Sequence, residues 1–494
     1  MIESFAATLV EVLWSTPLIV LVLAVGVMFT VLMAVPQVRR VGDMFRYLTG
    51  GGDSTQGVSS FQAFSMALGG RVGVGNIAGV ATAIHFGGPG ALFWMWVTAI
   101  VGSALAVVES SLAQVWKEEV NGEYRGGPAY YIEKGLGWKW LAAAYAVAGI
   151  IAFAFTGPSI QSFNIATSVE AAFAIDPRIT GVAVAVLFAA VVFGGMKRIG
   201  AVCGILVPFM AAGYIVIGLI IVGANAERVP GMFALIFTSA FGADALYGGM
   251  LGAVIMWGVK RAIYSSEAGT GSGAQASAAA EVSHPVKQGL AQGFSVYVDT
   301  LFVCTITGLM ILATNSYNVM GTEGQLIVEY APGLKAGPAY TQAAIDSVFP
   351  GFGGAFIAVA MFLFAFTTLL SFGFYADTNV AYLLRGHRWE IHVNRAIQVV
   401  LAVSIVLGAF RSSEFAWAIA DIGVGLYTWI NLIAILLLVR PALAVFKDYE
   451  RQRKAGKDPV FDPDAVGITN APLWHVIAAR GRAETADDPT PTTR

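Results

Sequence analysis

Long runs of apolar residues recur along this chain, and each run is bounded by short polar or charged stretches. A helix of about 20 apolar residues spans the hydrocarbon core of a bilayer. The pattern predicts eleven such helices, over residues 15–36, 59–84, 88–116, 140–168, 179–196, 199–223, 246–280, 288–314, 353–383, 394–410 and 414–439. We therefore expect an all-α polytopic membrane protein.

Two of the predicted spans are interrupted by glycine and polar residues. The span at 59–84 contains Gly-Gly-Arg-Val-Gly-Val-Gly-Asn-Ile-Ala-Gly, and the span at 246–280 contains Tyr-Ser-Ser-Glu-Ala-Gly-Thr-Gly-Ser-Gly. Such sequences disfavour a continuous helix. An opened backbone inside a membrane is tolerated only where protein buries it or where it lines a wet cavity. Two broken helices therefore predict a binding site.

Plainer explanations exist for both interruptions. Gly75 and Gly79 are also suited to close helix packing, and residues 264–273 are also compatible with a loop that ends its span. Packing alone does not explain Gly-Gly-Arg followed by Gly-Val-Gly-Asn. The small residues at 274–280 continue at helical length beyond the second interruption. These features favour two true breaks.

The order of the spans predicts an internal repeat. When the first span is set aside, each broken span is the first of a group of five, which is typical of two repeats with opposite topology. We expect an N-terminal span and linker at 1–58, repeats at 59–223 and 224–440, and a partly disordered cytoplasmic tail at 441–494. Lysine and arginine concentrate in alternate loops, which places the N-terminus outside and the C-terminus in the cytoplasm.

Composition narrows the possible functions. Of 494 residues, 57% are hydrophobic and only 12% are charged, and the formal net charge is −2. Cys203 and Cys304 lie in apolar segments and suggest neither a disulfide nor a metal framework. No phosphate-binding loop, nucleophile elbow or zinc-protease motif occurs. The sequence therefore does not predict an enzyme or a nucleic-acid-binding protein.

The first break offers chemistry for a zwitterion and a cation. One half-helix presents free N–H groups, which suit a carboxylate, and the other presents free carbonyls, which suit sodium. Asn76 and Gln161 add amide groups, although Gln161 also fits a role in joining helices. Adjacent hydroxyls at Thr367 and Thr368 can complete an oxygen shell, or can simply bond to the preceding helical turn.

Ionisable residues at membrane depth usually face the interior of a bundle. We expect Arg71 and Glu267, one in each break, to pair with each other. Asp299 is the best carboxylate for proton coupling if sodium is not the ion, although a structural role is the plainer explanation. Glu109 and Asp377 lie near span ends and are expected to reach water.

Several motifs together resemble the alanine/glycine:cation symporter family. They extend from about residue 60 to 440 and read Gly-Arg-Val-Gly-Val-Gly-Asn-Ile-Ala-Gly-Val-Ala, Gly-Gly-Pro-Gly-Ala-Leu-Phe-Trp-Met-Trp-Val, Glu-Ser-Ser-Leu-Ala-Gln, Gly-Gly-Pro-Ala-Tyr-Tyr, Arg-Ala-Ile-Tyr-Ser-Ser-Glu-Ala-Gly-Thr-Gly-Ser, His-Pro-Val-Lys-Gln-Gly, Val-Asp-Thr, Phe-Ala-Phe-Thr-Thr and Asp-Ile-Gly. The resemblance implies a LeuT-type 5+5 inverted-repeat fold with one extra N-terminal helix. It also implies uptake of alanine or glycine coupled to sodium or protons.

The resemblance further implies roles for particular residues. The implied substrate pocket comprises Val74, Gly75, Asn76, Gln161, Tyr264, Ser265, Ser266, Gly269 and Phe372. The implied sodium site comprises Gly69, Val72, Thr367 and Thr368. Four positions depart from the usual family pattern: Val74 for threonine, Ser266 for asparagine, Thr270 for methionine and Phe372 for tryptophan. These departures leave the exact substrate open.

We therefore predict a sodium-driven symporter of small neutral amino acids in the plasma membrane, working by alternating access. Its partners are the amino acid and membrane lipid; the oligomeric state is left open. The alternatives are proton-coupled transport of a different small amino acid and, less favoured, an ion channel, whose filter is more often shared among subunits.

Overall fold

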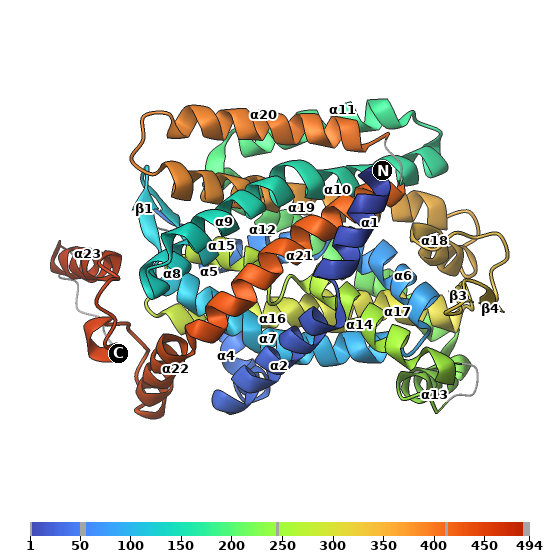
Figure 1. Cartoon of the computed structure of the whole chain (residues 1–494), viewed down its shortest axis with the longest axis horizontal. Coiled ribbons are helices and arrows are strands. Elements are labelled where there is room, and N and C mark those ends of the chain that lie inside the picture. Colours follow the sequence, from blue (N-terminus) through green and yellow to red (C-terminus); the bar gives the residue numbers. More distant parts are fainter. Residues whose placement is uncertain (1, 50–55, 244–246, 411–412, 488–494) are drawn as a thin grey trace.

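The computed structural model describes residues 2–49, 56–243, 247–410 and 413–487. In this part of the chain, seven helices are long and apolar enough to cross a membrane, and two bent helix pairs would raise that number to nine. Two further predicted spans fall on shorter or broken helices. The predicted count of eleven therefore stays a prediction, whereas the helical membrane architecture is confirmed (Figure 1).

The N-terminal half begins with an apolar region that continues through two helices and then enters a polar linker. The linker leads to the first broken span and the helices that follow it. The elements are α1 (Ile2–Leu13), α2 (Thr16–Leu32), α3 (Pro36–Arg39), α4 (Val41–Arg46), α5 (Ser60–Arg71), η1 (Gly75–Gly79), α6 (Val80–Gly87), α7 (Ala91–Val115), α8 (Pro128–Leu136), α9 (Lys139–Ile150), η2 (Ile151–Thr156), α10 (Gly157–Phe173), α11 (Pro177–Val192) and α12 (Gly195–Ala224).

The C-terminal half repeats the theme of a broken span followed by long helices. Its elements are η3 (Ala226–Arg228), α13 (Val229–Ala240), η4 (Gly248–Met250), α14 (Leu251–Ser266), α15 (Ser272–Ala278), α16 (Pro285–Val296), η5 (Tyr297–Cys304), α17 (Thr305–Ala313), α18 (Pro338–Asp346), α19 (Gly353–Leu384), α20 (Glu390–Gly408), α21 (Ser413–Leu437), α22 (Val439–Lys454), η6 (Asp464–Val466) and α23 (Leu473–Asp487). The sequence predicts disorder for residues 484–494 of the tail; of these, 484–487 belong to α23, and 488–494 lie outside the described residues.

Two small antiparallel hairpins lie in the loops between helices. One pairs β1 (Glu118–Val120) with β2 (Glu123–Arg125), and the other pairs β3 (Asn318–Met320) with β4 (Leu326–Glu329). The second hairpin and α18 occupy the long loop at 315–352, which the sequence predicts to be extracellular. Both sheets lie at the ends of the helices, at opposite ends of the bundle (Figure 1).

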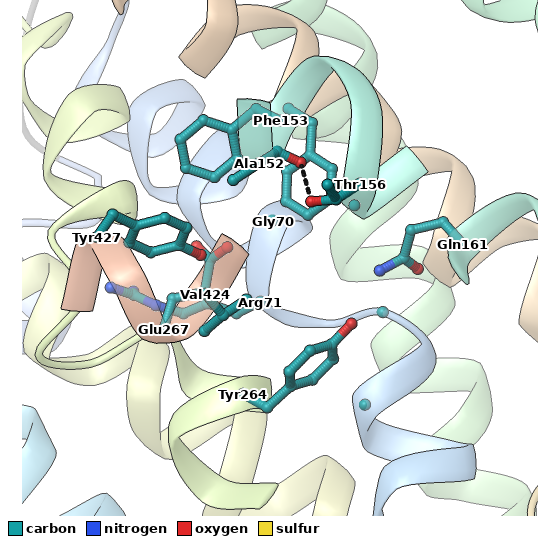
Figure 2. Close-up of a pocket in the computed structure, with 14 residues that line it drawn as sticks. Gly70, Arg71, Ala152, Phe153, Thr156, Gln161, Tyr264, Glu267, Val424 and Tyr427 are labelled. Carbon is teal, nitrogen blue, oxygen red and sulfur yellow. Dashed lines mark hydrogen bonds between the residues drawn. The ribbon is translucent and has the colours of Figure 1, made fainter. Parts of the chain in front are cut away.

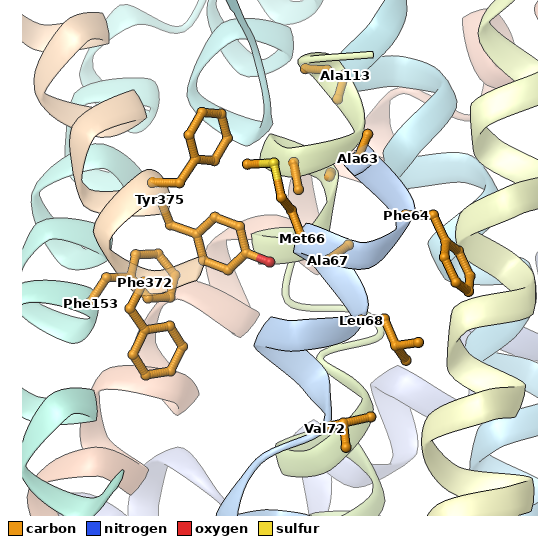
Figure 3. Packing of buried hydrophobic residues seen from close by; sticks show 14 of the residues in the cluster. Ala63, Phe64, Met66, Ala67, Leu68, Val72, Ala113, Phe153, Phe372 and Tyr375 are labelled. Atoms are coloured by element: carbon orange, nitrogen blue, oxygen red, sulfur yellow. The ribbon is translucent and has the colours of Figure 1, made fainter. Parts of the chain in front are cut away.

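The first broken helix occupies the centre of the bundle. The helix α5 packs against α12, α15, α16 and α19, and every side chain from Ala63 to Leu68 is buried. Figure 3 shows Met66 and Ala67 on the side that faces Tyr375 and Phe372, while Phe64 points to the opposite side. In contrast, α12 and α20 expose large apolar side chains, as expected for helices that face lipid.

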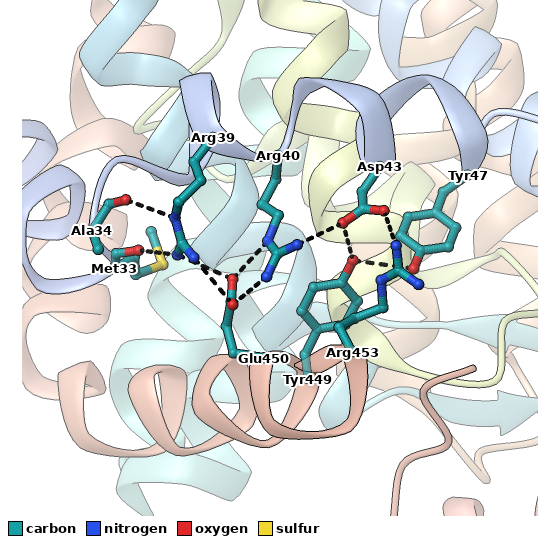
Figure 4. A network of polar contacts seen from close by, with 9 residues as sticks. All are labelled: Met33, Ala34, Arg39, Arg40, Asp43, Tyr47, Tyr449, Glu450 and Arg453. Carbon is teal, nitrogen blue, oxygen red and sulfur yellow. Dashed lines mark hydrogen bonds and ion pairs between the residues drawn. The ribbon is translucent and has the colours of Figure 1, made fainter. Parts of the chain in front are cut away.

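A polar cluster ties the linker after α2 to the amphipathic helix α22. Glu450 accepts hydrogen bonds from Arg39 (3.1 Å) and Arg40 (2.9 Å). Asp43 accepts a hydrogen bond from Arg453 at 2.7 Å. These five residues, which we call the α22 clamp, join segments some 410 positions apart in the chain (Figure 4). They fix α22 against the end of the bundle from which the linker emerges.

Candidate functional site

The first break separates α5 from η1. Helix α5 begins with a capping box in which Ser59 accepts from the Gln62 amide, and it ends where Val72 leaves helical geometry. The segment Gly75–Gly87 then continues at an angle of 49° to α5. The N–H of Val72 still donates to the Leu68 carbonyl of α5 at 2.7 Å, but those of Gly73 and Val74 lie between the two helices and need other partners.

Side-chain amides supply partners for this opened backbone. The N–H of Gly73 donates to Asn76 Oδ1 at 2.8 Å, and the N–H of Val74 donates to Gln161 Oε1 at 3.3 Å. Asn76 Nδ2 in turn donates to Asp299 Oδ1 at 2.6 Å. All of these side chains are buried, so the break is a polar centre enclosed by protein.

The second break lies between α14 and α15. Glu267, Gly269 and Gly271 have φ values of +52°, +90° and +78°, the left-handed conformation that ends a helix. The carbonyl of Glu267 accepts from the Thr270 hydroxyl at 2.6 Å, and that of Gly269 accepts from Asn431 at 2.9 Å. The predicted interruption at 264–273 is therefore a true break, and α15 resumes within the buried interior of the bundle.

A cavity lies between the two breaks and is closed by η2, α10, α19 and α21. Its volume is about 30 Å³, which is room for one or two water molecules. Figure 2 shows Gln161 and Tyr264 on one side of it, with Arg71, Glu267 and Tyr427 on the other. The lining residues are Gly70, Arg71, Gly73, Gly75, Ala152, Phe153, Thr156, Gly157, Gln161, Tyr264, Glu267, Phe372, Val424 and Tyr427.

The structure brings four of the nine predicted substrate residues to this cavity: Gly75, Gln161, Tyr264 and Phe372. The other five do not line the cavity, and their hydrogen bonds support the two breaks. Ser265 donates to Asp299, Ser266 offers its carbonyl to Arg71, and Gly269 offers its carbonyl to Asn431. Val74 and Asn76 contribute the hydrogen bonds to Gln161 and Asp299 described above.

Sequence reasoning missed the aromatic and small residues that close the cavity. Phe153, Thr156 and Gly157 come from η2 and the start of α10, and Val424 and Tyr427 come from α21. The Phe153 ring stands 5.4 Å from that of Phe372, between centroids. The only sequence signal was the Gly157-Pro158 pair within a long apolar run, because the apolar members look like ordinary lipid-facing residues.

The predicted sodium residues lie where α5 meets α19. The Thr368 hydroxyl is 2.9 Å from the Gly69 carbonyl and 3.1 Å from that of Phe364. The Thr367 hydroxyl instead contacts the Phe364 carbonyl at 3.0 Å and the sulfur of Met210 at 3.6 Å. Carbonyl and hydroxyl oxygens are donors that suit a hard cation, so Thr368 and Gly69 form the part of the predicted set that fits sodium most directly.

Ser371 was not predicted and extends the same row of oxygens. Its hydroxyl donates to the Met66 carbonyl at 2.7 Å, one turn along both helices from the Thr368 contact. Val72, the remaining predicted ligand, is fully buried at the end of α5. Hydroxyls of α19 thus bond to carbonyls of α5 at two successive turns.

The expected ion pair between Arg71 and Glu267 is wrong. In the described part of the chain, the Arg71 guanidinium donates to the Ser266 carbonyl at 2.6 Å, to Gln292 and to Ser295, and no ion pair joins it to Glu267. A guanidinium has five N–H donors in a rigid fork, and neutral carbonyl and amide oxygens across α14 and α16 satisfy that geometry. Both residues nevertheless line the cavity, as Figure 2 shows.

Two carboxylates that were expected to reach water are buried. Glu109 accepts a hydrogen bond from Asn431 at 2.6 Å, and Asp377 forms a 2.5 Å ion pair with Arg125. Both lie at the ends of long helices, but neighbouring segments cover those ends. Burial of a charged carboxylate is costly unless it is both paired and hydrogen-bonded. Asp377 has an ion-pair partner, whereas Glu109 has the hydrogen bond from Asn431 and no ion pair among the described residues.

Comparison with known proteins adds independent findings. The profile of the sodium:alanine symporter family matches residues 1–463. YrbD of Bacillus subtilis (strain 168) is 52% identical over 472 residues, covering 95% of this chain and 97% of the relative. The sodium/proton-dependent alanine carrier protein of Bacillus sp. (strain PS3) is 48% identical, covering 87% and 97%. The sodium/alanine symporter AgcS of Methanococcus maripaludis is 36% identical, covering 91% and 98%.

A solved structure supports the fold. The crystal structure of MhsT in complex with L-phenylalanine aligns with a TM-score of 0.56 at 16% identity, covering 86% of this chain and 99% of MhsT. Identity this low speaks only to the fold. The alignment confirms the predicted LeuT-type architecture and so accounts for the two broken helices at the centre of the bundle.

Proposed function

Because this chain belongs to the sodium:alanine symporter family, we propose that it takes up alanine or a similarly small neutral amino acid together with Na⁺. It is a multi-pass membrane protein and a secondary transporter. The observation that carries the choice of substrate class is the cavity between two opened helices, which offers both backbone groups and polar side chains. Such a site suits a zwitterion with a small side chain.

In this proposal the substrate carboxylate takes over the N–H groups of the first break. Asn76 and Gln161 hold the Gly73 and Val74 amides at 2.8 and 3.3 Å in the structure. The longer bond to Gln161 is the easier one to exchange for a carboxylate, and Gln161 also lines the cavity. Phe372 and Tyr264 limit the space for the side chain. The predicted residues Ser265, Ser266 and Gly269 then act indirectly, by supporting the second break.

Sodium would bind between α5 and α19. The carbonyls of Gly69 and Val72 and the hydroxyls of Thr367 and Thr368 are the proposed ligands, and the contact between Thr368 and Gly69 supports this placement. A cation there increases the affinity for a nearby carboxylate, and the substrate increases the affinity for sodium by the same factor. That reciprocity is what couples uptake to the sodium gradient.

Alternating access around this site completes the proposal. The two five-helix repeats, 59–223 and 224–440, would rock against each other, with the N-terminus outside and the C-terminus in the cytoplasm of the plasma membrane. The basic clusters around Arg39, Arg40 and α22 support this orientation. The substrate would cross unchanged, with no chemical step.

Transport by purified protein in liposomes tests the proposal. Accumulation of labelled alanine is expected when an inward Na⁺ gradient is imposed, and glycine and serine should compete. Gln161→Leu should raise the alanine concentration for half-maximal uptake by about tenfold. Asn164→Leu is a matched control, because Asn164 lies one turn away on α10 and bonds to the carbonyl of Ile160 in its own helix. Conductance without substrate would instead identify a channel.

A further inference from the structure

We propose that the carboxyl group of Asp299 binds a proton when the substrate binds, and thereby couples proton uptake to the proposed transport function. Asp299 lies in η5, a π-helical segment within the span that runs from α16 to α17, and its side chain is fully buried. It faces the first break through Asn76. The inference rests on the proposed function, since it concerns the same amino-acid site.

Neutral donors surround both oxygens of this carboxylate. Asn76 Nδ2 donates to Oδ1 at 2.6 Å, and the Thr300 hydroxyl donates to Oδ2 at 2.6 Å. The Ser265 hydroxyl lies 3.0 Å from Oδ1 and 3.1 Å from Oδ2. These three residues come from η1, η5 and α14, so the carboxyl group sits where both breaks meet the span that contains it.

No cation is paired with Asp299 among the residues that the structure describes. Arg71 of α5 is the charged group that attracts it electrostatically, but the Arg71 guanidinium bonds to Ser266, Gln292 and Ser295 instead. Glu267, beyond the end of α14, adds a second negative group. Cys304 of η5 is the titratable side chain in direct contact with the donors of Asp299.

The other elements packed on η5 hold their ionisable groups elsewhere. On α14, Lys260 pairs with Asp421 at 2.6 Å, and Arg261 and Tyr264 stack on each other. On α16, Lys287 pairs with Asp458 at 2.6 Å. The Tyr214 hydroxyl of α12 bonds to Thr307, Glu109 of α7 bonds to Asn431, and η1 and α17 contain no ionisable side chains.

A buried carboxylate without a counter-ion is costly as an anion, so any further negative charge nearby favours the binding of a proton or a cation. The orientation of Asn76 favours the proton. Its oxygen is committed to the Gly73 N–H, which fixes the side-chain amide so that the NH₂ group faces Asp299. An NH₂ group repels a cation, so a sodium ion at Asp299 would lack this ligand.

The surrounding hydroxyls fit both protonation states. A hydroxyl can donate to a carboxylate and can accept from a carboxylic acid. When Asp299 is protonated, the Ser265 oxygen can accept a hydrogen bond from the acid O–H and turn its own hydrogen towards Cys304, whose sulfur lies 3.3 Å from the Ser265 oxygen. The site therefore gains or loses a proton without leaving a buried polar group unpaired.

Asn76 links this site directly to the proposed substrate site, since one amide bridges Gly73 and Asp299. A substrate carboxylate arriving at the break brings a second negative charge close to Asp299. Two like charges in a buried site disfavour ionisation of both, which draws a proton to Asp299. By reciprocity, protonation of Asp299 strengthens substrate binding by the same factor.

Proton uptake on substrate binding provides the test. Alanine is added to the purified, sodium-loaded protein in weakly buffered detergent solution with a pH indicator, and binding is measured in parallel by isothermal titration. The wild-type protein should take up protons as it binds alanine. Asp299→Asn should bind alanine with no proton uptake, while Glu109→Gln should retain the uptake. Glu109 is the matched control, because it is an equally buried carboxyl group hydrogen-bonded by an asparagine.

The outcomes separate this inference from the proposed function. Alanine binding without proton uptake in the wild type, or with full uptake in Asp299→Asn, would overturn the role of Asp299 and leave the transport function intact. Absence of alanine binding in the wild type would contradict the proposed function itself. If Asp299→Asn does not fold, infrared difference spectra of the wild type decide: alanine should produce the carbonyl band of a buried carboxylic acid, and its absence would overturn the proposal.

Discussion

The two broken helices solve the same problem, unpaired peptide groups in a membrane, with different partners. In the first break, side-chain amides hold two backbone N–H groups, and the bond from Val74 to Gln161 is 3.3 Å long. In the second break, fixed donors hold the carbonyls. Tyr145 donates to Thr270, Asn431 donates to Gly269, and Thr270 folds back on Glu267.

The difference indicates a division of labour. The second break has three residues in the left-handed conformation and no α-helical continuity across 267–271, so its shape is set by local turns and close packing. In the first break, the Asn76 amide bridges Gly73 and Asp299, and the Gln161 amide holds Val74 through a longer hydrogen bond that a ligand can replace. We therefore expect the first break to take the ligand and the second to hold the cavity open.

Gly75→Leu should have the largest effect on transport. A Cβ at position 75 would lie 3.3 Å from Ser265 Cα and 3.4 Å from Tyr264, and the rest of a leucine side chain would enter the cavity. Overpacking of about 3 kcal/mol corresponds to a loss of roughly 100-fold or more in uptake. Gly213→Leu is the control, because nothing lies within 4 Å of its Cβ position. Unchanged uptake by the Gly75 variant would remove the ligand from this break.

Gly271→Ala should damage stability more than ligand binding. Gly271 has φ of +78°, and an added Cβ would meet Pro128 Cγ at 2.4 Å. Gly122→Ala shares the φ of +78° but has open space around its Cβ position. We expect a loss of about 2–3 kcal/mol for Gly271→Ala and about 1 kcal/mol for Gly122→Ala. Thermal unfolding in detergent measures both, and equal losses would show that the second break tolerates movement.

Thr368→Ala should raise the sodium concentration for half-maximal uptake by about tenfold, because one oxygen beside Gly69 is lost. Thr367→Ala should have a smaller effect, since its hydroxyl contacts Met210 and its own helix. The measurement is alanine uptake at a range of sodium concentrations. An equal shift in both variants would show that Thr367 turns towards the ion, and a shift confined to the alanine dependence would contradict the ion assignment.

Glu450→Gln changes the α22 clamp and no residue of either break, and should have the smallest effect. Burial raises the pKa of Glu450, but the hydrogen bond and charge of Arg40 lower it by more, so the pKa lies below its usual value. The stabilisation from the α22 clamp is therefore fully present above the ordinary glutamate pKa and is lost as the pH falls through the lowered value. The variant should cost less than about 1 kcal/mol at neutral pH.

Thermal unfolding across a pH series checks this prediction. The stability difference between wild type and Glu450→Gln should vanish at acidic pH, where the wild-type carboxylate is protonated as well. The alanine and sodium dependences of uptake should not move in either case. A shift in either dependence would show that the α22 clamp affects the two breaks.

The sequence was sufficient to predict the helical membrane fold and the position of both breaks. Glycine, arginine and small polar residues inside apolar runs weaken a helix wherever it lies, so the signal is local. The predicted repeat boundaries and the count of eleven spans stay predictions. Helix length alone does not settle the number of spans, because α11 and α14 are only 16 residues long.

The arrangement of the side chains could not be predicted as well. Ser265 faces Asp299 while its neighbour Tyr264 lines the cavity, and Thr367 and Thr368 likewise point to different partners. Successive residues on a helix lie about 100° apart, so a motif contains residues of several faces. The π-helical segments at 151–156 and 297–304 shift these faces again, and neither left a clear mark on the sequence.

The contacts of Arg71 can form only after the second half of the chain has been synthesised. Its hydrogen-bond partners Ser266, Gln292 and Ser295 follow it by 195 to 224 positions. Translation delivers the N-terminal half first, so the arginine enters the bilayer well before any of these acceptors has left the ribosome. A fragment that stops short of the second broken helix would retain an unsatisfied guanidinium in its interior, and the nascent chain must tolerate that group until its second half has been inserted.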